Sequence, residues 1–515
     1  MAVQQKADVG VERLRNRGGN ATVGDLRGLP LGEIADAALA GAAVRGSAWT
    51  SVRAHRVRRA ELRLRDGGLA GSREATSSGV AVSVVLGGVA GFAARDEPTP
   101  AAAAAAARAA VDGARVLRPL AGEQLSLADE PVHREAVWRS AYETDPFRVE
   151  ESEKLAVLAE WSGRLLAAPQ VDHVYAKLVA VREDVFYADA AGTSALQHRV
   201  RLYPQLIAVR TGGPAVATIR TLAPPSGRGW EYVSGAGWDW NAELAAIPEW
   251  LDEKSRAPAV EPGRYDLVLD PTNLWLTLHE SVGHATELDR VLGAEAGYAG
   301  TSFPGCERLG ELEYGSSAMN VTADRTADHG LATVGFDDEG VAAQEWDIVR
   351  DGVLVGYQLD RAGARRLGLP RSNGCTYADS AEHVPMLRMA NVSLQPAPGG
   401  PSTGELISSV EHGLYVVGDD SWSIDMQRLN FQFTGQRFYR IEHGRLAGQV
   451  RDAAYQSSTP ELWHALEAVG GPETYRLMGA DQCGKGQPGQ LAAAGHGCPS
   501  AIFRGIRVLR TDGRA

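Results

Sequence analysis

Two histidines and a glutamate lie within the short segment His279-Glu280-Ser281-Val282-Gly283-His284. Metal-assisted hydrolysis needs a Lewis acid, a water molecule and a nearby carboxylate that takes the proton of the water. Imidazole is a common ligand of zinc, and one helical His-Glu segment can supply two ligands and the base together. We therefore interpret His279 and His284 as candidate zinc ligands and Glu280 as the candidate general base.

The spacing of the two histidines does not suit a regular α-helix. Five residues turn an ideal helix by about 500°, which leaves the two imidazoles about 140° apart, against about 40° for a spacing of four. Either the helix is distorted, and Gly283 has the backbone freedom for a bulge or an early end, or one histidine is not a ligand. In the second case Glu280 and His284, four residues apart, would share one helical face and bind the metal. The spacing leaves both alternatives open.

The chain that leads into this segment is apolar. Leu274, Leu276 and Leu278 precede the first histidine. We expect a helix here, with Thr272 or Asn273 as its N-cap. The histidines then emerge from a buried segment, and buried ionisable side chains need partners or a metal.

At least one further ligand must come from another part of the chain, and the cysteines near the carboxyl terminus are the candidates. Cys483 is followed by Gly484 and Lys485, which give backbone access and a positive charge that favours the thiolate. Cys498 follows His496 closely, and on spacing alone this pair is at least as good a chelating unit. The residues leave both assignments open.

Hydrophobic periodicity predicts that helices and strands alternate in the amino-terminal half. Helices are expected at 31–41, 98–117 and 151–166, and strands at 51–65, 79–93, 171–181, 185–190 and 196–210. The later strands, with a turn at Ala191-Gly192-Thr193, form a β-meander. Because Arg63 and Arg65 alternate with leucines, the basic stretch 53–65 is interpreted as the solvated face of a strand.

The carboxyl-terminal half has a different pattern. Short β-rich segments from 312 to 508 alternate with turn signals such as Asp351-Gly352, which predicts a twisted, largely antiparallel β domain. We therefore expect an α+β protein in which an N-terminal α/β region holds helices and the meander, and a C-terminal β-rich domain carries the metal-binding helix. The expected parts are a mobile tail at 1–30, the N-terminal region at 31–255 with a break near 120–150, and the C-terminal β-rich domain with the candidate metal site at 256–515.

The bulk composition limits the partners. The chain of 515 residues carries a net charge of −12, whereas binding to phosphate needs clustered Lys and Arg. The first residues lack the apolar run of a signal peptide, and no stretch approaches the roughly 18 apolar residues of a membrane span. We expect a cytoplasmic protein that binds neither nucleic acid nor membrane. In that reducing compartment the cysteines, including Cys306 and Cys375, are expected to form no disulfides.

Several short segments of the second half carry a resemblance to a known family. They are Leu278-His279-Glu280-Ser281-Val282-Gly283-His284, Gly300-Thr301-Ser302, Asp337-Asp338-Glu339-Gly340, Met386-Leu387-Arg388-Met389-Ala390-Asn391 and Cys483-Gly484-Lys485. Their order is that of the TldD/PmbA family of peptidases. The sequence resembles this family from about residue 40 to the carboxyl terminus, most strongly from Leu278 to Leu429.

The resemblance implies a site and a function. The TldD type of this family carries the His-Glu-x-x-x-His motif and the paired PmbA (TldE) type lacks it, so the chain resembles the TldD type. His279, His284 and Cys483 are then expected to bind Zn²⁺, with Glu280 as general base and no other cofactor. The family also implies a homodimer, or a heterodimer with a PmbA-type (TldE-type) subunit, around an inner cavity. The expected substrates are unfolded or modified peptides.

Two other functions are consistent with the resemblance. A non-catalytic partner subunit of a peptidase complex would keep the family shell, but it would not need intact His279, Glu280, His284 and Cys483. A metal-dependent amide hydrolase acting on a small metabolite would use the same residues. Peptide hydrolysis is the leading interpretation.

The chain departs from the family pattern in two places. Gly486-Gln487 follow Lys485 directly, and His496 and Cys498 come afterwards. The segment Gly418-Asp419-Asp420-Ser421-Trp422 replaces a glycine-rich stretch. These departures indicate a divergent branch with its own substrate preference.

Overall fold

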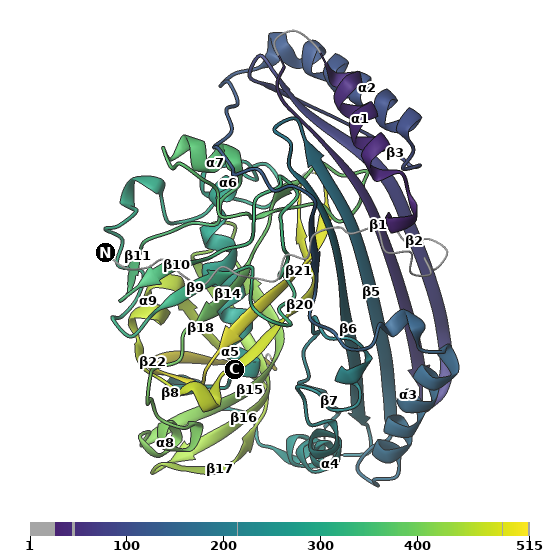
Figure 1. The fold of residues 1–515 in the computed structure, drawn as a ribbon. Helices are drawn as coiled ribbons and strands as arrows, with labels where there is room; N and C mark the ends of the chain where they lie inside the picture. The colour runs from purple at the N-terminus through teal and green to yellow at the C-terminus, as the bar shows by residue number, and fades with distance from the viewer. Residues whose placement is uncertain (1–25, 44–46, 214, 487, 513–515) are drawn as a thin grey trace.

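The computed structural model describes residues 26–43, 47–213, 215–486 and 488–512. The fold is α+β, as predicted, with a large sheet from the first half of the chain and a β-rich second half packed against one face of it (Figure 1). Residues 1–25, most of the expected tail, lie outside the described residues. The last residues of the expected tail include the short 3-10 helix Leu26–Gly28, in which Leu26 is buried.

The sheet of the first half is built from long hairpins. Its strands lie in the order β3-β2-β1-β5-β6-β4 with β7 beside β6. Within the described part of this sheet, only the β4–β6 pair is parallel. The strands are β1 (Ser47–Arg65), β2 (Gly68–Leu86), β3 (Val89–Arg95), β4 (Ala136–Arg139), β5 (His173–Asp189), β6 (Ser194–Arg210) and β7 (Ala217–Arg220). The single strand expected at 79–93 is instead two strands, because Gly87 and Gly88 both have positive φ and form the turn between them.

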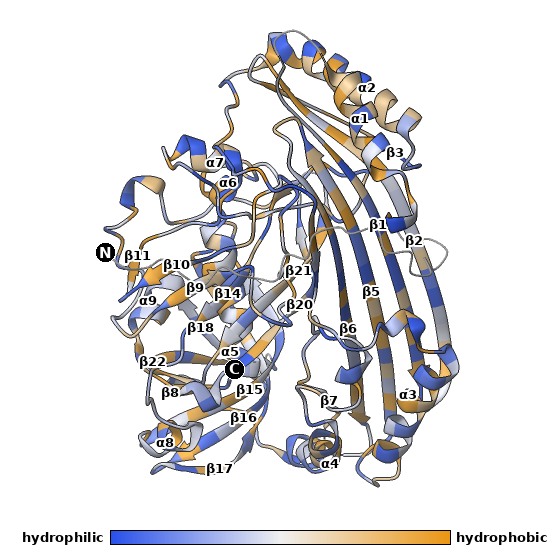
Figure 2. Ribbon diagram, in the orientation of Figure 1, coloured by the Kyte–Doolittle hydropathy of each residue, from blue (hydrophilic) through white to orange (hydrophobic). Residues whose placement is uncertain are grey.

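Helices cover the outer face of this sheet. They are α1 (Leu31–Ala42), α2 (Pro100–Leu117), α3 (Glu151–Leu166) and α4 (Trp240–Arg256). Val52 packs with α1 and α2, and Leu62 packs with α3 and α4. Since successive strand residues point to opposite faces, apolar and polar residues alternate along the strands, as Figure 2 shows for β1 and β5. No helix in the described part of the chain is long and apolar enough to cross a bilayer.

The second half contains a closed barrel. Strands β15, β8, β22, β18 and β16 pair in that order, and the β15–β16 pairing closes the ring. These strands are β8 (Gly263–Leu269), β15 (His412–Ile424), β16 (Asn430–Glu442), β18 (Ala453–Ser458) and β22 (Ala501–Arg510). Helix α5 (Pro271–Leu278) follows β8, and all its residues are buried. The barrel is therefore the support of the segment that carries the two histidines.

The remaining elements surround the barrel. They are β9 (Val321–Asp324), β10 (Glu345–Arg350), β11 (Val353–Leu354), β12 (Thr376–Tyr377), β13 (Met386–Leu387), β14 (Asn391–Leu394), β17 (Arg445–Val450), β19 (Leu466–Val469), β20 (Arg476–Lys485), β21 (Gln490–Cys498), α6 (Leu288–Val291), α7 (Arg361–Arg366), α8 (Thr403–Ser408) and α9 (Thr459–His464). The β20–β21 hairpin lies between the barrel and the large sheet (Figure 1).

Charged side chains join the inner face of the sheet to the second half. Arg53 is 4% exposed and pairs with Asp338 at 2.8 Å, so the interpretation of 53–65 as a solvated face is wrong at this residue. Arg201 on β6 contacts Asp481 on β20 at 3.2 Å and Glu183 on β5 at 2.7 Å. Glu183 is buried, and its partners explain why β5 continues through a charged stretch that looked like a break in the sequence.

Candidate metal centre

Helix α5 begins at Pro271 and is capped by the residue before it. The carboxylate of Asp270 accepts a hydrogen bond from the backbone N–H of Thr272 at 3.0 Å, so the expectation that Thr272 or Asn273 caps the helix is wrong. Proline is favoured at the first helical position, which makes Asp270 the N-cap. Asn273 instead donates through its amide to the carbonyl oxygens of Gly418 and Thr434 at 2.9 and 3.0 Å. These bonds fix the helix to β15 and β16.

The helix widens where the histidines begin. His279–Gly283 form a π-helix, and the N–H of His284 donates to the carbonyl oxygen of His279. A π-turn closes between residues five apart, so the two imidazoles lie on the same side with ring centroids 4.7 Å apart. The alternative of a distorted helix therefore holds. Gly283 contributes space rather than unusual φ, because a Cβ there would lie 2.5 Å from Sδ of Met389.

The structure brings Cys483 to the two histidines. Its Sγ is 3.4 Å from Nε2 of His279 and 3.4 Å from Nε2 of His284, and the three atoms lie within 4.8 Å of one another. A tetrahedral zinc site with Zn–S near 2.3 Å and Zn–N near 2.0–2.1 Å places sulfur and nitrogen about 3.6 Å apart. The cluster therefore has the dimensions of a zinc site.

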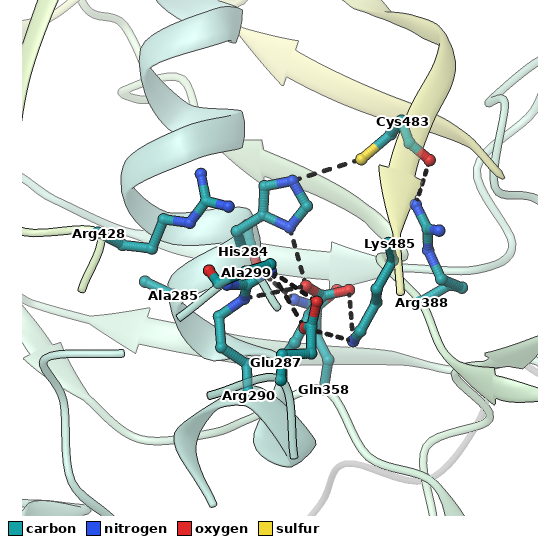
Figure 3. A network of polar contacts seen from close by, with 12 residues as sticks. His284, Ala285, Glu287, Arg290, Ala299, Gln358, Arg388, Arg428, Cys483 and Lys485 are labelled. Carbon is teal, nitrogen blue, oxygen red and sulfur yellow. Dashed lines mark hydrogen bonds and ion pairs between the residues drawn. The ribbon is translucent and has the colours of Figure 1, made fainter. Parts of the chain in front are cut away.

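A carboxylate orients His284. Nδ1 of His284 lies 2.8 Å from Oε2 of Glu287, and Glu287 also contacts Lys485 at 3.2 Å and Arg290 at 3.8 Å (Figure 3). These cations hold the pKa of Glu287 well below its ordinary value, although burial opposes them. A carboxylate acceptor fixes the proton on Nδ1 and leaves Nε2 free. The position of Lys485 in the sequence had suggested that its charge favours the thiolate of Cys483. In the structure Lys485 instead pairs with Glu287, the partner of His284.

A second histidine orients His279. Nδ1 of His279 lies 2.6 Å from Nε2 of His496, and Nδ1 of His496 lies 3.0 Å from the carbonyl oxygen of Val392. Because a carbonyl only accepts, the hydrogen-bond network assigns the proton of His496 to Nδ1 and makes its Nε2 an acceptor. His279 must then donate from its own Nδ1. Nε2 of His279 therefore carries no proton, and it faces Sγ of Cys483.

All three imidazoles are neutral near pH 7. Burial lowers the pKa of His284 to about 3 and that of His496 to about 4. Burial, together with the charges of neighbouring groups, also holds the pKa of His279 well below 6.5. Neutral imidazole is the form that binds metals.

The protons of the three ligand atoms do not suffice to pair them with one another. Burial raises the pKa of Cys483 to about 11, so its sulfur carries one proton, which it can donate to only one of the two bare Nε2 atoms. An unpaired buried acceptor costs about 1–3 kcal/mol. A divalent cation bound by all three atoms removes that cost and favours the thiolate. The donor set therefore fits a metal ion.

Glu280 lies beside the cluster and is not part of it. Its carboxylate, 5% exposed, forms an ion pair with Arg428 and accepts a hydrogen bond from the side chain of Trp422. Burial raises the pKa of Glu280, and Arg428 opposes that shift. This placement disfavours the alternative in which Glu280 and His284 are the metal ligands.

The structure separates the other cysteines from the cluster. Among the described residues, the group of mutually close ligand atoms contains neither Cys306, Cys375 nor Cys498, and all three thiols are free. His496 contributes as the partner of His279 and does not chelate with Cys498.

Sequence reasoning missed Glu287, Arg428 and the role of His496. A local signal existed for Glu287, which follows His284 by three residues.

Comparison with protein families assigns the chain to a class. The model of the "PmbA/TldA metallopeptidase C-terminal domain" matches residues 262–510, which hold the whole cluster. The model of "PmbA/TldA metallopeptidase domain 1" matches residues 50–114 in the large sheet. The protein is thus of the metallopeptidase class. The chain belongs to the PmbA/TldD metallopeptidase family, as the resemblance of its motifs predicted.

Individual relatives agree with this assignment. A "Metalloprotease" of Methanothermobacter thermautotrophicus is 27% identical over 472 residues, which are 89% of this chain and 95% of the relative. A "Zinc metalloprotease TldD homolog" of Saccharolobus solfataricus is 25% identical over 265 residues, which are 51% of this chain and 56% of the relative. The chain therefore matches only about half of the length of some relatives.

Solved structures share the fold. TldE from Thermococcus kodakarensis superposes with a TM-score of 0.68 at 15% identity, over 90% of this chain and 96% of that chain. A proposed modulator of DNA gyrase from Thermotoga maritima has a TM-score of 0.70 at 16% identity, over 93% of this chain and 100% of that chain.

Proposed function

We propose that this chain is a zinc-dependent peptidase in which His279, His284 and Cys483 bind the metal and Glu280 is the general base. The observation that carries the proposal is the convergence of three buried ligand atoms, Sγ of Cys483 and the Nε2 atoms of two histidines whose ring protons lie on Nδ1. Each histidine donates from Nδ1 and offers Nε2. Three protein ligands leave one tetrahedral position for water or substrate, as catalytic zinc sites require.

Ligand chemistry favours zinc over other divalent ions. Two imidazoles with one thiolate form a set of intermediate softness that suits zinc, whereas Mg²⁺ and Ca²⁺ prefer oxygen ligands. The name of the Saccharolobus solfataricus relative includes zinc. Bound zinc would supply a Lewis acid that polarises the peptide carbonyl and lowers the pKa of water towards about 7.

The side chains would then divide the reaction between them. Glu280 accepts the proton of the attacking water as the new carbon–oxygen bond forms, and it passes that proton to the nitrogen as the carbon–nitrogen bond breaks. Arg428 and Trp422 hold the Glu280 carboxylate in place for this transfer. Glu287 and His496 keep the two ligand imidazoles in the required tautomer.

The proposed substrates are unfolded or modified peptides. Since the candidate ligands and Glu280 are all buried, a folded protein surface cannot place a peptide bond against them. Digesting one polypeptide in folded and unfolded form tests this access. The family resemblance and the TldE structure support a homodimer or a heterodimer with a TldE-type subunit as the working assembly.

A pair of cysteine variants tests the proposal. Cys483→Ala should lose bound zinc and peptide cleavage while remaining folded, because it removes one of three ligands. Cys498→Ala is the matched control, since Cys498 is also buried and lies two positions beyond His496 on the same hairpin. Zinc per chain and cleavage of an unfolded peptide are measured on each protein. Full zinc in Cys483→Ala together with zinc loss in Cys498→Ala would contradict the assignment.

Two alternatives make different forecasts for the wild-type protein. A non-catalytic partner subunit would cleave no peptide even when loaded with zinc. A hydrolase of small metabolites would bind zinc at the same residues and hydrolyse small amides faster than peptides. Competition between a peptide and a small amide substrate separates these functions.

A further inference from the structure

One hairpin supplies both donors that hold Glu280. Trp422 lies near the end of β15, and Arg428 lies in the turn before β16. The β15–β16 pairing is irregular between Asp419 and Trp422, and such irregularities redirect a side chain. This is the segment in which the sequence departs from the family. The tip of this hairpin therefore belongs to the site.

The turn is built to aim Arg428. Its φ is +60°, a left-handed conformation that non-glycine residues adopt rarely and that often marks a functional position. The carboxylate of Asp425 accepts hydrogen bonds from the backbone N–H groups of Gln427, Leu429 and Asn430 at 3.0, 2.8 and 3.0 Å. The hydroxyl of Thr459 donates to the carbonyl oxygen of Arg428 at 2.7 Å. The backbone of Arg428 is thus fixed on both sides.

The guanidinium of Arg428 has unused donors in a buried place. Its side chain is 14% exposed, Nη1 bonds to Glu280, and Nε is buried without a hydrogen-bond partner in the described part of the chain. A guanidinium presents five N–H donors in a rigid plane. A buried cation with free donors next to the general base is suited to an oxyanion.

We propose that Arg428 is a catalytic residue that donates to the carbonyl oxygen of the scissile peptide bond and stabilises the negative charge that forms there. This inference rests on the proposed function. As water adds to the carbonyl carbon, its oxygen forms the new bond, Glu280 takes its proton, and the π electrons of the carbonyl move onto the carbonyl oxygen. When the carbon–nitrogen bond breaks, the electrons return and the nitrogen leaves with the proton from Glu280.

The contacts of Glu280 show that its carboxylate does not depend on Arg428 alone. Trp422 already donates a neutral hydrogen bond to Glu280, so orientation of the base does not by itself require a cation. A fixed positive donor in a site that excludes water stabilises a developing oxyanion strongly.

The test compares Arg428→Gln with Arg440→Gln. Arg440 is on β16, the strand that follows the turn of Arg428. It is 46% exposed and pairs with Glu442, so its substitution controls for loss of one arginine. Zinc per chain, kcat and KM for an unfolded peptide, and the Kd of a phosphinic peptide that mimics the tetrahedral oxyanion are measured. Arg428→Gln should keep its zinc, and its kcat should fall by about 10²-fold to 10³-fold. The Kd of the phosphinic peptide should rise by a similar factor. Arg440→Gln should match the wild type.

The double variant Glu280→Gln/Arg428→Gln separates direct from indirect action. If Arg428 contacts the oxyanion, Arg428→Gln should raise the Kd of the phosphinic peptide by about the same factor in the Glu280→Gln background as it does in the wild-type background. Unchanged affinity in that background would mean that Arg428 acts only through Glu280 and would overturn the proposal. The proposal would also be overturned if cleavage required a free carboxyl terminus on the peptide and Arg428→Gln abolished that requirement. Absence of zinc from the wild-type protein would instead overturn the proposed function.

Discussion

His496 is expected to set the zinc affinity although it does not bind the metal. Its Nε2 accepts the Nδ1 proton of His279 at 2.6 Å, and its ring stacks on Trp275 with centroids 6.1 Å apart. His496→Phe keeps a ring in this place and removes the acceptor. His496→Gln keeps an acceptor, the amide oxygen, and removes the ring.

The structure gives the size of the effect. His279 is 5% exposed and His496 is 0% exposed, so His496→Phe leaves the Nδ1 proton of His279 buried without an acceptor. An unpaired buried donor costs about 1–3 kcal/mol, which corresponds to roughly 5-fold to 150-fold in a dissociation constant. Loss of a partner to a metal-binding histidine commonly costs about 10-fold to 100-fold in affinity. We expect zinc binding to weaken within that range.

Competition with a chelator at fixed pH measures the zinc Kd of each variant. His464→Phe is the control, because His464 is exposed and bonds only to the carbonyl oxygen of Pro460 among the described residues. The thermal midpoint of each metal-free protein shows whether packing is preserved, and His496→Gln should recover most of the lost affinity. A folded His496→Phe protein with wild-type zinc affinity would refute the assigned role of His496.

Three further predictions follow from the same structure. Glu280→Gln should keep its zinc and fold but lose about 10²-fold to 10⁴-fold in turnover; a metal-free variant would show instead that Glu280 is a ligand. Arg201→Met should lower the free energy of unfolding in urea by about 3 kcal/mol, since it removes a partner of buried Glu183, and an unchanged free energy would contradict this. In the metal-free protein the pKa values of His284 and His496 are lowered to about 3 and about 4. As the pH falls below 6.5, these histidines bind protons in the unfolded protein before they do so in the folded protein, so the free energy of unfolding decreases. At pH 5 the loss is about 2 kcal/mol for each histidine, and an unfolding free energy that does not change between pH 7 and pH 5 would contradict the assigned protonation.

The sequence predicted elements whose cause is local. The helix at 151–166 matches α3 residue for residue, because its leucines recur at helical spacing. The turn at Gly87-Gly88 was missed, since apolar residues continue on both sides of it. The charged stretch around Glu183 suggested a break in β5 because its partners, Arg199 and Arg201, come from the neighbouring strand. Pairing between strands is not visible in a local pattern.

The same distinction holds for the site. The spacing of the histidines indicated that a distorted helix was one of two alternatives. The π-turn itself depends on close packing of Gly283 against Met389, which is far away in the chain. Spacing could not choose between Cys483 and Cys498, and the family resemblance favoured Cys483. His496 was noticed as a potential ligand. Its contact with His279, across 217 residues of sequence, needed the fold.

Zinc K-edge X-ray absorption on the purified chain tests the central claim most directly, because it reports the atoms around the metal without reference to activity. The account predicts one sulfur at about 2.3 Å from the Sγ of Cys483, and two imidazole nitrogens at about 2.0–2.1 Å from His279 and His284. The sulfur signal should disappear in Cys483→Ala and persist in Cys498→Ala. A zinc-loaded wild-type protein without a sulfur neighbour would contradict the proposed metal centre.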